Sequence, residues 1–309
     1  EMKKFKYRDS LATGSVAAGG TLGILIPPSI GFIAYAIVTQ ESVGKLFIAG
    51  ILPGLLLIFL FCGSIYLRCK WNPSLGPATQ RSSYREKLLS LRGTWQVILL
   101  FALVMGGIFS GAVTPTEAGG VGVIGALILA AFSPEFSRKK LYKSLNDGIQ
   151  MSTMIITMLI GVSILNNFII LTGLPSDLSN FLQSMKLSPY VFFVCVMLLY
   201  LVLGMLMNII PMVMITIPIL FPSIVALGFD PIWFGVVMVI IMELGQISPP
   251  VGINVFVISG VAKDVPMGRI FQGILPFAIC EVAAIIILVF FPQIALFLPA
   301  RMNVLPSIP

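Results

Sequence analysis

The sequence predicts an all-α protein that crosses a lipid bilayer several times and contains two inverted repeats, each with a helix broken by a Pro-Pro pair. Composition is the first reason: 58% of the 309 residues are hydrophobic and 10% are charged, with a mean hydropathy of +1.04, whereas soluble domains are roughly 25% charged. Second, apolar stretches of membrane-spanning length alternate with short basic segments. Third, two of these stretches carry the same proline-interrupted motif.

The composition also excludes several classes of function. The chain has no histidine, so it cannot form a Ser-His-Asp triad, a His-Cys pair or an HExxH zinc site. The four cysteines are scattered without a disulfide or metal-ligand spacing, and there is no GxxxxGK[ST] nucleotide loop. The net charge of +7 comes from basic residues between apolar spans, which is a topology signal. We therefore expect no enzyme, no organic cofactor and no nucleic-acid partner.

Residues 1–67 are expected to be the remainder of the first repeat. Residues 12–26 form an apolar arm, residues 30–38 continue it after a break at Pro27-Pro28, and residues 46–67 form a spanning helix. In the second half, the segment that corresponds to the start of the chain follows a hydrophobic hairpin. We therefore expect this chain to begin inside its first repeat, after a similar hairpin.

Residues 68–147 are expected to connect the repeats. Their first part is a loop that should be cytoplasmic, because it holds a single acid, Glu86, against many basic residues. The basic residues are Arg68, Lys70, Arg81, Arg85, Lys87 and Arg92. Residues 95–112 and 118–132 should form a helical hairpin in which Thr114 and Glu117 make a capping box. Residues 137–147 are amphipathic and basic, and should lie on the cytoplasmic surface.

Residues 148–309 are expected to form the second repeat. After a span at residues 148–171 and a segment without Lys or Arg, two apolar arms at residues 190–207 and 212–227 are joined by only four residues, Asn208 to Pro211. This pattern favours a re-entrant hairpin over residues 190–227, and a single long kinked pair of helices is the alternative. A second broken helix over residues 233–261 and a last helix over residues 270–298 complete the chain.

The two broken helices are internal copies. Residues 22–28 and 244–250 share Leu, Gly, Pro and Pro in register at a constant offset of 222, and a looser match continues downstream. Four basic residues precede the first copy, whereas residues 223–231, before the second copy, contain none. Because basic loops are cytoplasmic, the two copies should enter the membrane from opposite sides. The repeats are therefore expected to be inverted.

The broken helices are also the candidate site. Adjacent prolines remove two backbone donors, and the freed carbonyls are costly in hydrocarbon unless protein, water or an ion meets them. Paired interruptions of this kind are a sequence signal for a transporter's binding site, although two kinked structural helices are the alternative. Ser248 offers a hydroxyl and a carbonyl, whereas its counterpart Ile26 offers only a carbonyl, so we expect inequivalent sites. Glu243 has two alternative roles. It either bonds nearby backbone and orders the helices, or it tunes the binding of an ion at the break.

Four motifs in order resemble the large membrane subunit of a tripartite ATP-independent periplasmic (TRAP) transporter, and the resemblance covers essentially the whole chain. They are GTLGILIPPSI at residues 20–30, GKLFIAGILPG at 44–54, GGIFSG followed by TPTEA at 106–118, and ELGQISPPVGIN at 243–254. The resemblance implies an elevator-type secondary transporter in the bacterial inner membrane. It further implies sodium coupling, a small four-helix membrane subunit, a periplasmic substrate-binding protein and a small organic acid as substrate.

The resemblance also carries binding residues onto this chain. Sodium and substrate would be held where hairpin tips meet the broken helices, at Gly20, Gly23, Ile26, Pro27, Pro28 and Ser29 in the first half, and at Asn208, Pro211, Gly245, Ser248, Pro249, Pro250 and Asn254 in the second. Many members have Asp where this chain has Asn208, so a contact that needs that charge is in doubt here. The leading alternative is an ion-coupled organic-anion carrier that works without a binding protein. A pore or scaffold subunit would more naturally show a polar filter, which the sequence lacks.

Overall fold

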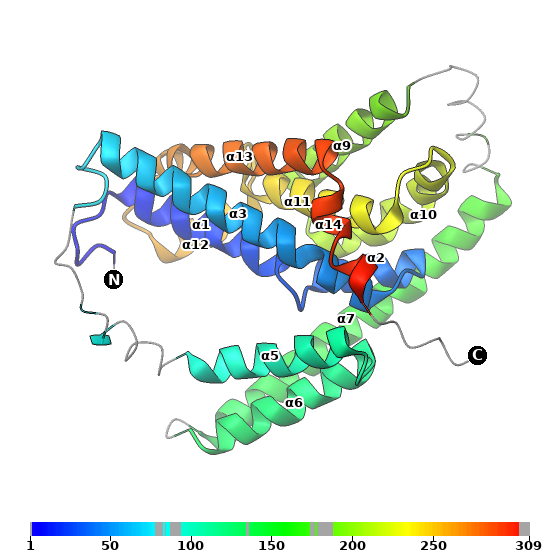
Figure 1. The fold of residues 1–309 in the computed structure, drawn as a ribbon, viewed down its shortest axis with the longest axis horizontal. Coiled ribbons are helices and arrows are strands. Elements are labelled where there is room, and N and C mark those ends of the chain that lie inside the picture. The colour runs from blue at the N-terminus through cyan, green and yellow to red at the C-terminus, as the bar shows by residue number, and fades with distance from the viewer. Residues whose placement is uncertain are drawn as a thin grey trace. The chain divides into compact units, whose positions relative to one another are not determined.

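The computed structural model describes residues 2–77, 83, 85–86, 94–133, 136–173, 177 and 188–302. The regular structure in these ranges is helical, without a strand (Figure 1), as the sequence predicts. The chain divides into two compact units. The larger consists of Glu1–Thr79 with Val162–Ala300, and the smaller of Gln80–Gly161 with Arg301–Pro309.

The larger unit starts with α1 (Asp9–Leu25), α2 (Ile30–Thr39) and α3 (Val43–Trp71). The expected break at the first Pro-Pro pair separates α1 from α2, because neither proline has an N–H to continue the helix. Ser29 starts α2 as its N-cap, with its side chain accepting a hydrogen bond from the Phe32 N–H at 3.4 Å. Helix α3 continues through Pro53 in its interior and is longer than the predicted span.

The second half of the larger unit contains the remaining helices. They are α9 (Pro189–Leu206), α10 (Ile209–Ala226), α11 (Pro231–Ile247), α12 (Ile253–Val261), α13 (Met267–Phe290), α14 (Gln293–Leu296) and a 3-10 turn at Pro299–Arg301. The bounds of α12 are those predicted, and α11 begins only two residues earlier. The prediction of one last helix over residues 270–298 was wrong at its end, because Pro292 cannot continue α13 and a short separate helix follows.

Helices α9 and α10 form an antiparallel hairpin. The Tyr190 ring near the start of α9 lies 6.2 Å, centroid to centroid, from the Phe229 ring just after α10. The Tyr200 hydroxyl in α9 lies 2.9 Å from the Thr216 hydroxyl in α10. These contacts give the hairpin arrangement rather than one long kinked element. Its position inside the bilayer stays a prediction.

Helix α11 is the centre of the larger unit. Every residue from Ile232 to Ile247 is buried, and α1, α3, α9 and α13 pack around the helix (Figure 1). A helix that is hydrophobic on all sides is stable only where it is enclosed by other helices or lipid. Here neighbouring helices enclose it.

The first broken helix runs antiparallel along α11. The Tyr35 hydroxyl in α2 donates a hydrogen bond to the Pro231 carbonyl, at 2.8 Å, at the start of α11. Ala17 in α1 shares a hydrophobic cluster with Ile247 at the end of α11. The first break therefore lies beside the middle of α11, and the second break lies level with the middle of α1.

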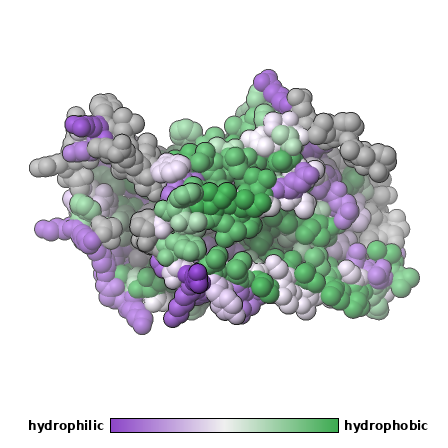
Figure 2. Space-filling view, turned by 90° about the horizontal axis from the view of Figure 1, so that it is seen from below, coloured by the Kyte–Doolittle hydropathy of each residue, from purple (hydrophilic) through white to green (hydrophobic). Residues whose placement is uncertain are grey.

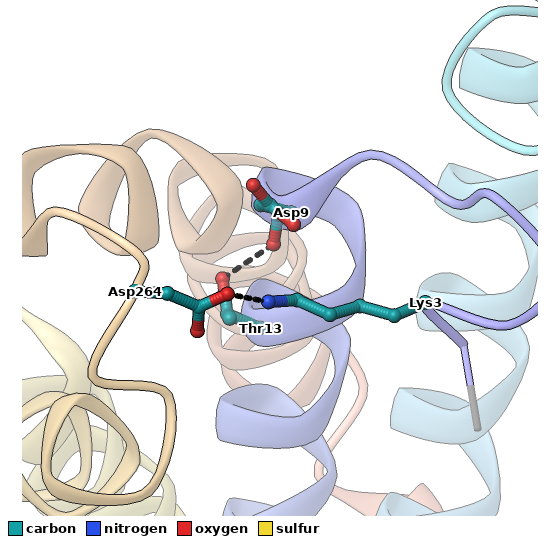
Figure 3. A network of polar contacts seen from close by, with 4 residues as sticks. All are labelled: Lys3, Asp9, Thr13 and Asp264. Atoms are coloured by element: carbon teal, nitrogen blue, oxygen red, sulfur yellow. Dashed lines mark hydrogen bonds and ion pairs between the residues drawn. The ribbon is translucent and has the colours of Figure 1, made fainter.

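A polar contact joins the beginning of the chain to the loop between α12 and α13. The Lys3 ammonium pairs with the Asp264 carboxylate, close to Thr13, whose hydroxyl donates to the Asp9 carbonyl at 2.7 Å (Figure 3). The hydrogen bond from Lys3 lowers the pKa of Asp264, and the same contact raises the pKa of Lys3. Both side chains are more than half exposed, so this pair orders the surface and contributes little stability.

The smaller unit contains α5 (Trp95–Ser110), α6 (Pro115–Ala131) and the first part of α7 (Arg138–Leu171). The capping box predicted at the start of α6 is confirmed: the Glu117 N–H donates to the Thr114 hydroxyl at 3.3 Å, and the Thr114 N–H donates to the Glu117 carboxylate at 2.7 Å. The separation of an amphipathic segment at 137–147 from a span at 148–171 was wrong. No proline interrupts this stretch, and a single glycine at the expected boundary, Gly148, does not break the helix. Arg81, Lys87 and Arg92 of the predicted basic loop lie outside the described residues.

Within the described residues, six helical segments are long and apolar enough to cross a membrane. They are Asp9–Thr39, Val43–Trp71, Arg138–Leu171, Pro189–Leu206, Ile209–Ala226 and Met267–Phe290. Many large hydrophobic side chains on these segments are exposed, and Figure 2 shows hydrophobic residues over much of one face. Exposed apolar surface of this extent marks contact with lipid or partner helices.

Candidate functional site: two interrupted helices and a buried acidic pair

The first break leaves specific carbonyls without helical partners. The Ile26 N–H still donates to the Leu22 carbonyl at 2.9 Å, but the next two residues are prolines. The carbonyls of Gly23 and Ile24 would receive their helical hydrogen bonds from positions 27 and 28. They are therefore free to accept a hydrogen bond or to coordinate a cation.

The second break is built differently. The Ser248 hydroxyl donates to the Leu244 carbonyl at 2.6 Å, and the Ser248 N–H donates to the Gly245 carbonyl at 3.0 Å. Pro249 and Pro250 remove the donors that would have met the carbonyls of Gly245 and Gln246, so the Gln246 carbonyl is the counterpart of the free group at Ile24. The Ser248 oxygen keeps its lone pairs as an acceptor.

A glycine then restarts the second helix. Gly252, the N-cap of α12, has φ +61°, and a Cβ there would lie 3.2 Å from the Ser248 carbonyl oxygen. Only glycine adopts this backbone readily. Asn254 follows on the first turn of α12 and is half-buried.

The hairpin of α9 and α10 meets both broken helices. Gly204 near the end of α9 contacts α11, where a Cβ on Gly245 would lie only 2.7 Å from the Gly204 Cα. Ile209 at the start of α10 contacts α2, where a Cβ added to Gly31 would lie 3.4 Å from the Ile209 side chain. The segment between Gly204 and Ile209 therefore lies near both, and it contains Asn208, which is exposed and makes no side-chain cap to α10.

The predicted residues differ in their surroundings. Gly245 is tightly enclosed, whereas its counterpart Gly23, like Gly20, has no atom within 4 Å of an added Cβ. Pro27 and Ser29 are buried, Ile26 and Pro211 are half-buried, and Pro28, Pro249 and Pro250 are exposed. Helix α3 packs closely against the first break, because a Cβ added to Gly50 of α3 would lie 2.8 Å from the Leu25 carbonyl oxygen.

Sequence reasoning missed two side chains between the breaks. Glu281 of α13 and Thr21 of α1 are fully buried, and the Thr21 hydroxyl lies 2.9 Å from Glu281 Oε1. Glu243 of α11 is also fully buried. A single acid within the last apolar span was the available signal for Glu281. Thr21 lies 222 positions before Glu243, which is the offset between the two broken-helix motifs, so the two residues occupy equivalent positions.

Comparisons with known proteins agree with this architecture. Residues 1–294 match the family model described as "Tripartite ATP-independent periplasmic transporter, DctM component". The chain is 36% identical over 299 residues to the C4-dicarboxylate TRAP transporter large permease protein DctM of Pseudomonas aeruginosa, covering 96% of this chain and 69% of that protein. It is 32% identical to the 2,3-diketo-L-gulonate TRAP transporter large permease protein YiaN of Escherichia coli, with coverages of 95% and 68%. The sialic acid TRAP transporter large permease protein SiaM of Vibrio cholerae is 30% identical, with coverages of 96% and 69%.

Proposed function

Because this chain belongs to the DctM family of TRAP transporter large permeases, we propose that it carries small organic acids across the membrane in a sodium-coupled, binding-protein-dependent transporter. The chain is a multi-pass integral protein of the bacterial inner membrane. Its relatives are named for C4-dicarboxylates, sialic acid and 2,3-diketo-L-gulonate. An organic acid that carries a carboxylate is the substrate class common to these names.

The observation that carries the sodium proposal is the pair of interrupted helices. A small hard cation prefers oxygen ligands, and each break offers backbone carbonyls at a helix C-terminus, where the helix dipole also favours a cation. The N-termini of α2 and α12 carry the positive end of the helix dipole, which suits a substrate carboxylate. The same two elements thus supply groups for both the ion and the anion.

The two proposed ion sites are chemically unequal. In the first, Gly23 and Ile24 supply carbonyls and Ile26 has no side-chain oxygen. In the second, Ser248 adds a hydroxyl oxygen to the Gln246 carbonyl. We assign Gly20, Pro27, Pro28 and Ser29 to shaping the first site, and Asn208, Pro211, Pro249, Pro250 and Asn254 to shaping the second. Transport by an elevator movement, and inversion of the two repeats, belong to the same proposal.

The coupling has sufficient energy. One net positive charge that enters down a membrane potential of about 100 mV contributes roughly 2.3 kcal/mol. Two sodium ions that enter with a monoanion carry one net charge, which supports a concentration ratio of roughly fortyfold before the sodium gradient is added. No nucleotide is required. A small four-helix membrane subunit and a periplasmic binding protein are the partners expected for this family. The alternative, a carrier that works without a binding protein, predicts uptake by the permease alone.

Uptake by proteoliposomes tests this function. The complete complex is reconstituted, a labelled dicarboxylate or sialic acid is added with its binding protein, and sodium is titrated at saturating substrate. We expect uptake to need both an inward sodium gradient and the binding protein. Ser248→Ala should raise the half-saturating sodium concentration by the equivalent of about 1–3 kcal/mol, whereas Ile26→Ala should leave it in place. Equal uptake in choline medium would overturn sodium coupling.

A further inference from the structure

Two buried acids between the breaks lack the partners that such groups require. Glu243 and Glu281 are both 0% exposed. Both oxygens of Glu243 and one oxygen of Glu281 have no hydrogen-bond partner among the described residues. Taking a carboxylate out of water is expensive unless a counter-charge and hydrogen bonds replace the water, and an unsatisfied buried group in a native protein calls for a missing water or ion. The arrangement can therefore accept a bound cation.

The two acids and Thr21 form one cluster from three helices. Helices α1, α11 and α13 all pack against one another. The Thr21 hydroxyl lies 2.9 Å from Glu281 Oε1, and it also lies 2.8 Å from the Ala18 carbonyl, so its one proton serves one of these acceptors at a time. Glu243 of α11 lies level with Thr21, because α1 and α11 run antiparallel with Ala17 beside Ile247.

The cluster stands midway between the breaks. Thr21 precedes the end of α1, and Glu243 precedes the end of α11, by the same number of residues. The antiparallel arrangement of α1 and α11 brings these equivalent positions to the same level. Glu281 of α13 completes the group from the side.

The protein offers these acids no basic partner in its described part. Neither acid makes an ion pair or a hydrogen bond with a basic side chain among the described residues. Tyr35 of α2 and Tyr200 of α9 are neutral groups engaged with the Pro231 carbonyl and the Thr216 hydroxyl. The two acids are therefore stable in the protonated form or with a cation supplied from outside the chain.

We propose that Glu243, Glu281 and Thr21 form a third cation site, separate from the two breaks, that holds a sodium ion by oxygen atoms alone. Its ligands are two carboxylates and one hydroxyl, which are hard donors without nitrogen or sulfur. No group of three or more His, Cys, Asp or Glu side chains occurs in the described ranges, so the cluster lacks the several carboxylates of a strong divalent site. A bound ion there would tie α1 of the first half to α11 and α13 of the second.

Direct binding of ²²Na⁺ to the purified full-length permease complex in detergent tests the proposal. Wild type is compared with Glu243→Gln, Glu281→Gln, the double variant and Thr21→Val. The double variant should bind one sodium ion fewer per permease, each single Glu variant should bind that ion about tenfold or more weakly, and Thr21→Val should weaken it less. Glu41→Gln, which changes an acid in the loop between α2 and α3, is the matched control and should bind as wild type does.

Further arms separate this site from the breaks and from other cations. Ser248→Ala should keep the ion that the Glu variants lose, so the sites can fail independently. Unchanged sodium stoichiometry and affinity in the double variant would overturn the proposal. Displacement of that ion by micromolar Ca²⁺ would overturn its assignment to sodium. If the double variant does not purify as a folded protein, the neutral Thr21→Val change decides: wild-type binding in it would argue against the site.

Discussion

Gly204 and Gly245 meet face to face, because a Cβ on Gly245 would lie 2.7 Å from the Gly204 Cα and 2.8 Å from the Leu201 carbonyl oxygen. This contact is between backbones, so no side-chain movement can relieve an added methyl group. It fixes the hairpin arm α9 against the last turns of α11, just before the second break. The position of the hairpin tip therefore depends on the absence of two side chains.

Gly245→Ala and Gly204→Ala should each destabilise the permease by about 1–3 kcal/mol, since an overpacked contact has to separate α9 from α11. Thermal unfolding of the purified complex measures the effect. Gly19→Ala is the matched control, because an added Cβ at that position of α1 meets no atom within 4 Å and alanine favours the helix. Equal unfolding midpoints for Gly245→Ala and Gly19→Ala would show that the backbones are not in contact.

Replacing both Pro249 and Pro250 by alanine should lower sodium affinity. The new N–H groups at these positions could donate to the carbonyls of Gly245 and Gln246, which would close the break and withdraw oxygen ligands. Sodium titration of uptake gives the answer. Pro218→Ala, within α10, changes a helical proline away from the break and should leave the half-saturating sodium concentration unaltered. An unaltered value in the Pro249→Ala/Pro250→Ala variant would mean that these carbonyls are not ligands.

The membrane orientation can be read by labelling single cysteines in intact cells. We expect a cysteine at Thr116, an exposed residue at the start of α6, to react with a membrane-impermeant reagent from the periplasm. A cysteine at Ser83, which is also exposed and lies in the basic loop, should react only after the membrane is opened. The background requires Cys62, Cys69, Cys195 and Cys280 to be replaced first. Reaction of both positions from the same side would contradict the assigned topology.

The Lys3–Asp264 pair should give a small pH-dependent contribution to stability. The pKa of Asp264 is lowered from its usual 3.8, so the contribution is complete above 3.8 and disappears as pH falls through the lower folded-state value. The pKa of Lys3 is raised above 10.5, so the contribution is also lost as pH rises through that higher value. Comparing the unfolding midpoints of wild type and Asp264→Asn over this range checks the prediction. With Lys3→Gln already present, Asp264→Asn should have no further effect; an additive loss would speak against the pair.

Several helix ends were predictable because local sequence determines them. The proline pairs define the ends of α1 and α11 through missing donors, and Thr114 with Glu117 defines the start of α6. The continuity of α7 and the early end of α13 were not foreseen, since hydropathy alone does not distinguish one long helix from two elements. The repeat boundaries and membrane depths stay predictions.

The candidate site also has one part that the sequence predicts and one part that it does not. The two breaks follow from a repeated sequence, and the difference in their side-chain oxygens follows from Ile26 and Ser248. The proximity of Glu281 to Thr21 joins residues from opposite ends of the chain, and no periodic pattern encodes that pairing. The close contact of Gly204 with Gly245 likewise depends on how α9 crosses α11. Both contacts result from tertiary packing, which local sequence patterns do not specify.

The complete enclosure of α11 has a consequence for biosynthesis. This helix has 17 residues and is shorter than the segments long enough to span the bilayer, and it carries Glu243, which is costly to expose to hydrocarbon. The ribosome releases α11 before α13, the helix that brings Glu281 and covers one side of it. A nascent chain halted before residue 267 would contain α11 without α13 packed against it. Stable insertion of α11 thus waits for the synthesis of α13.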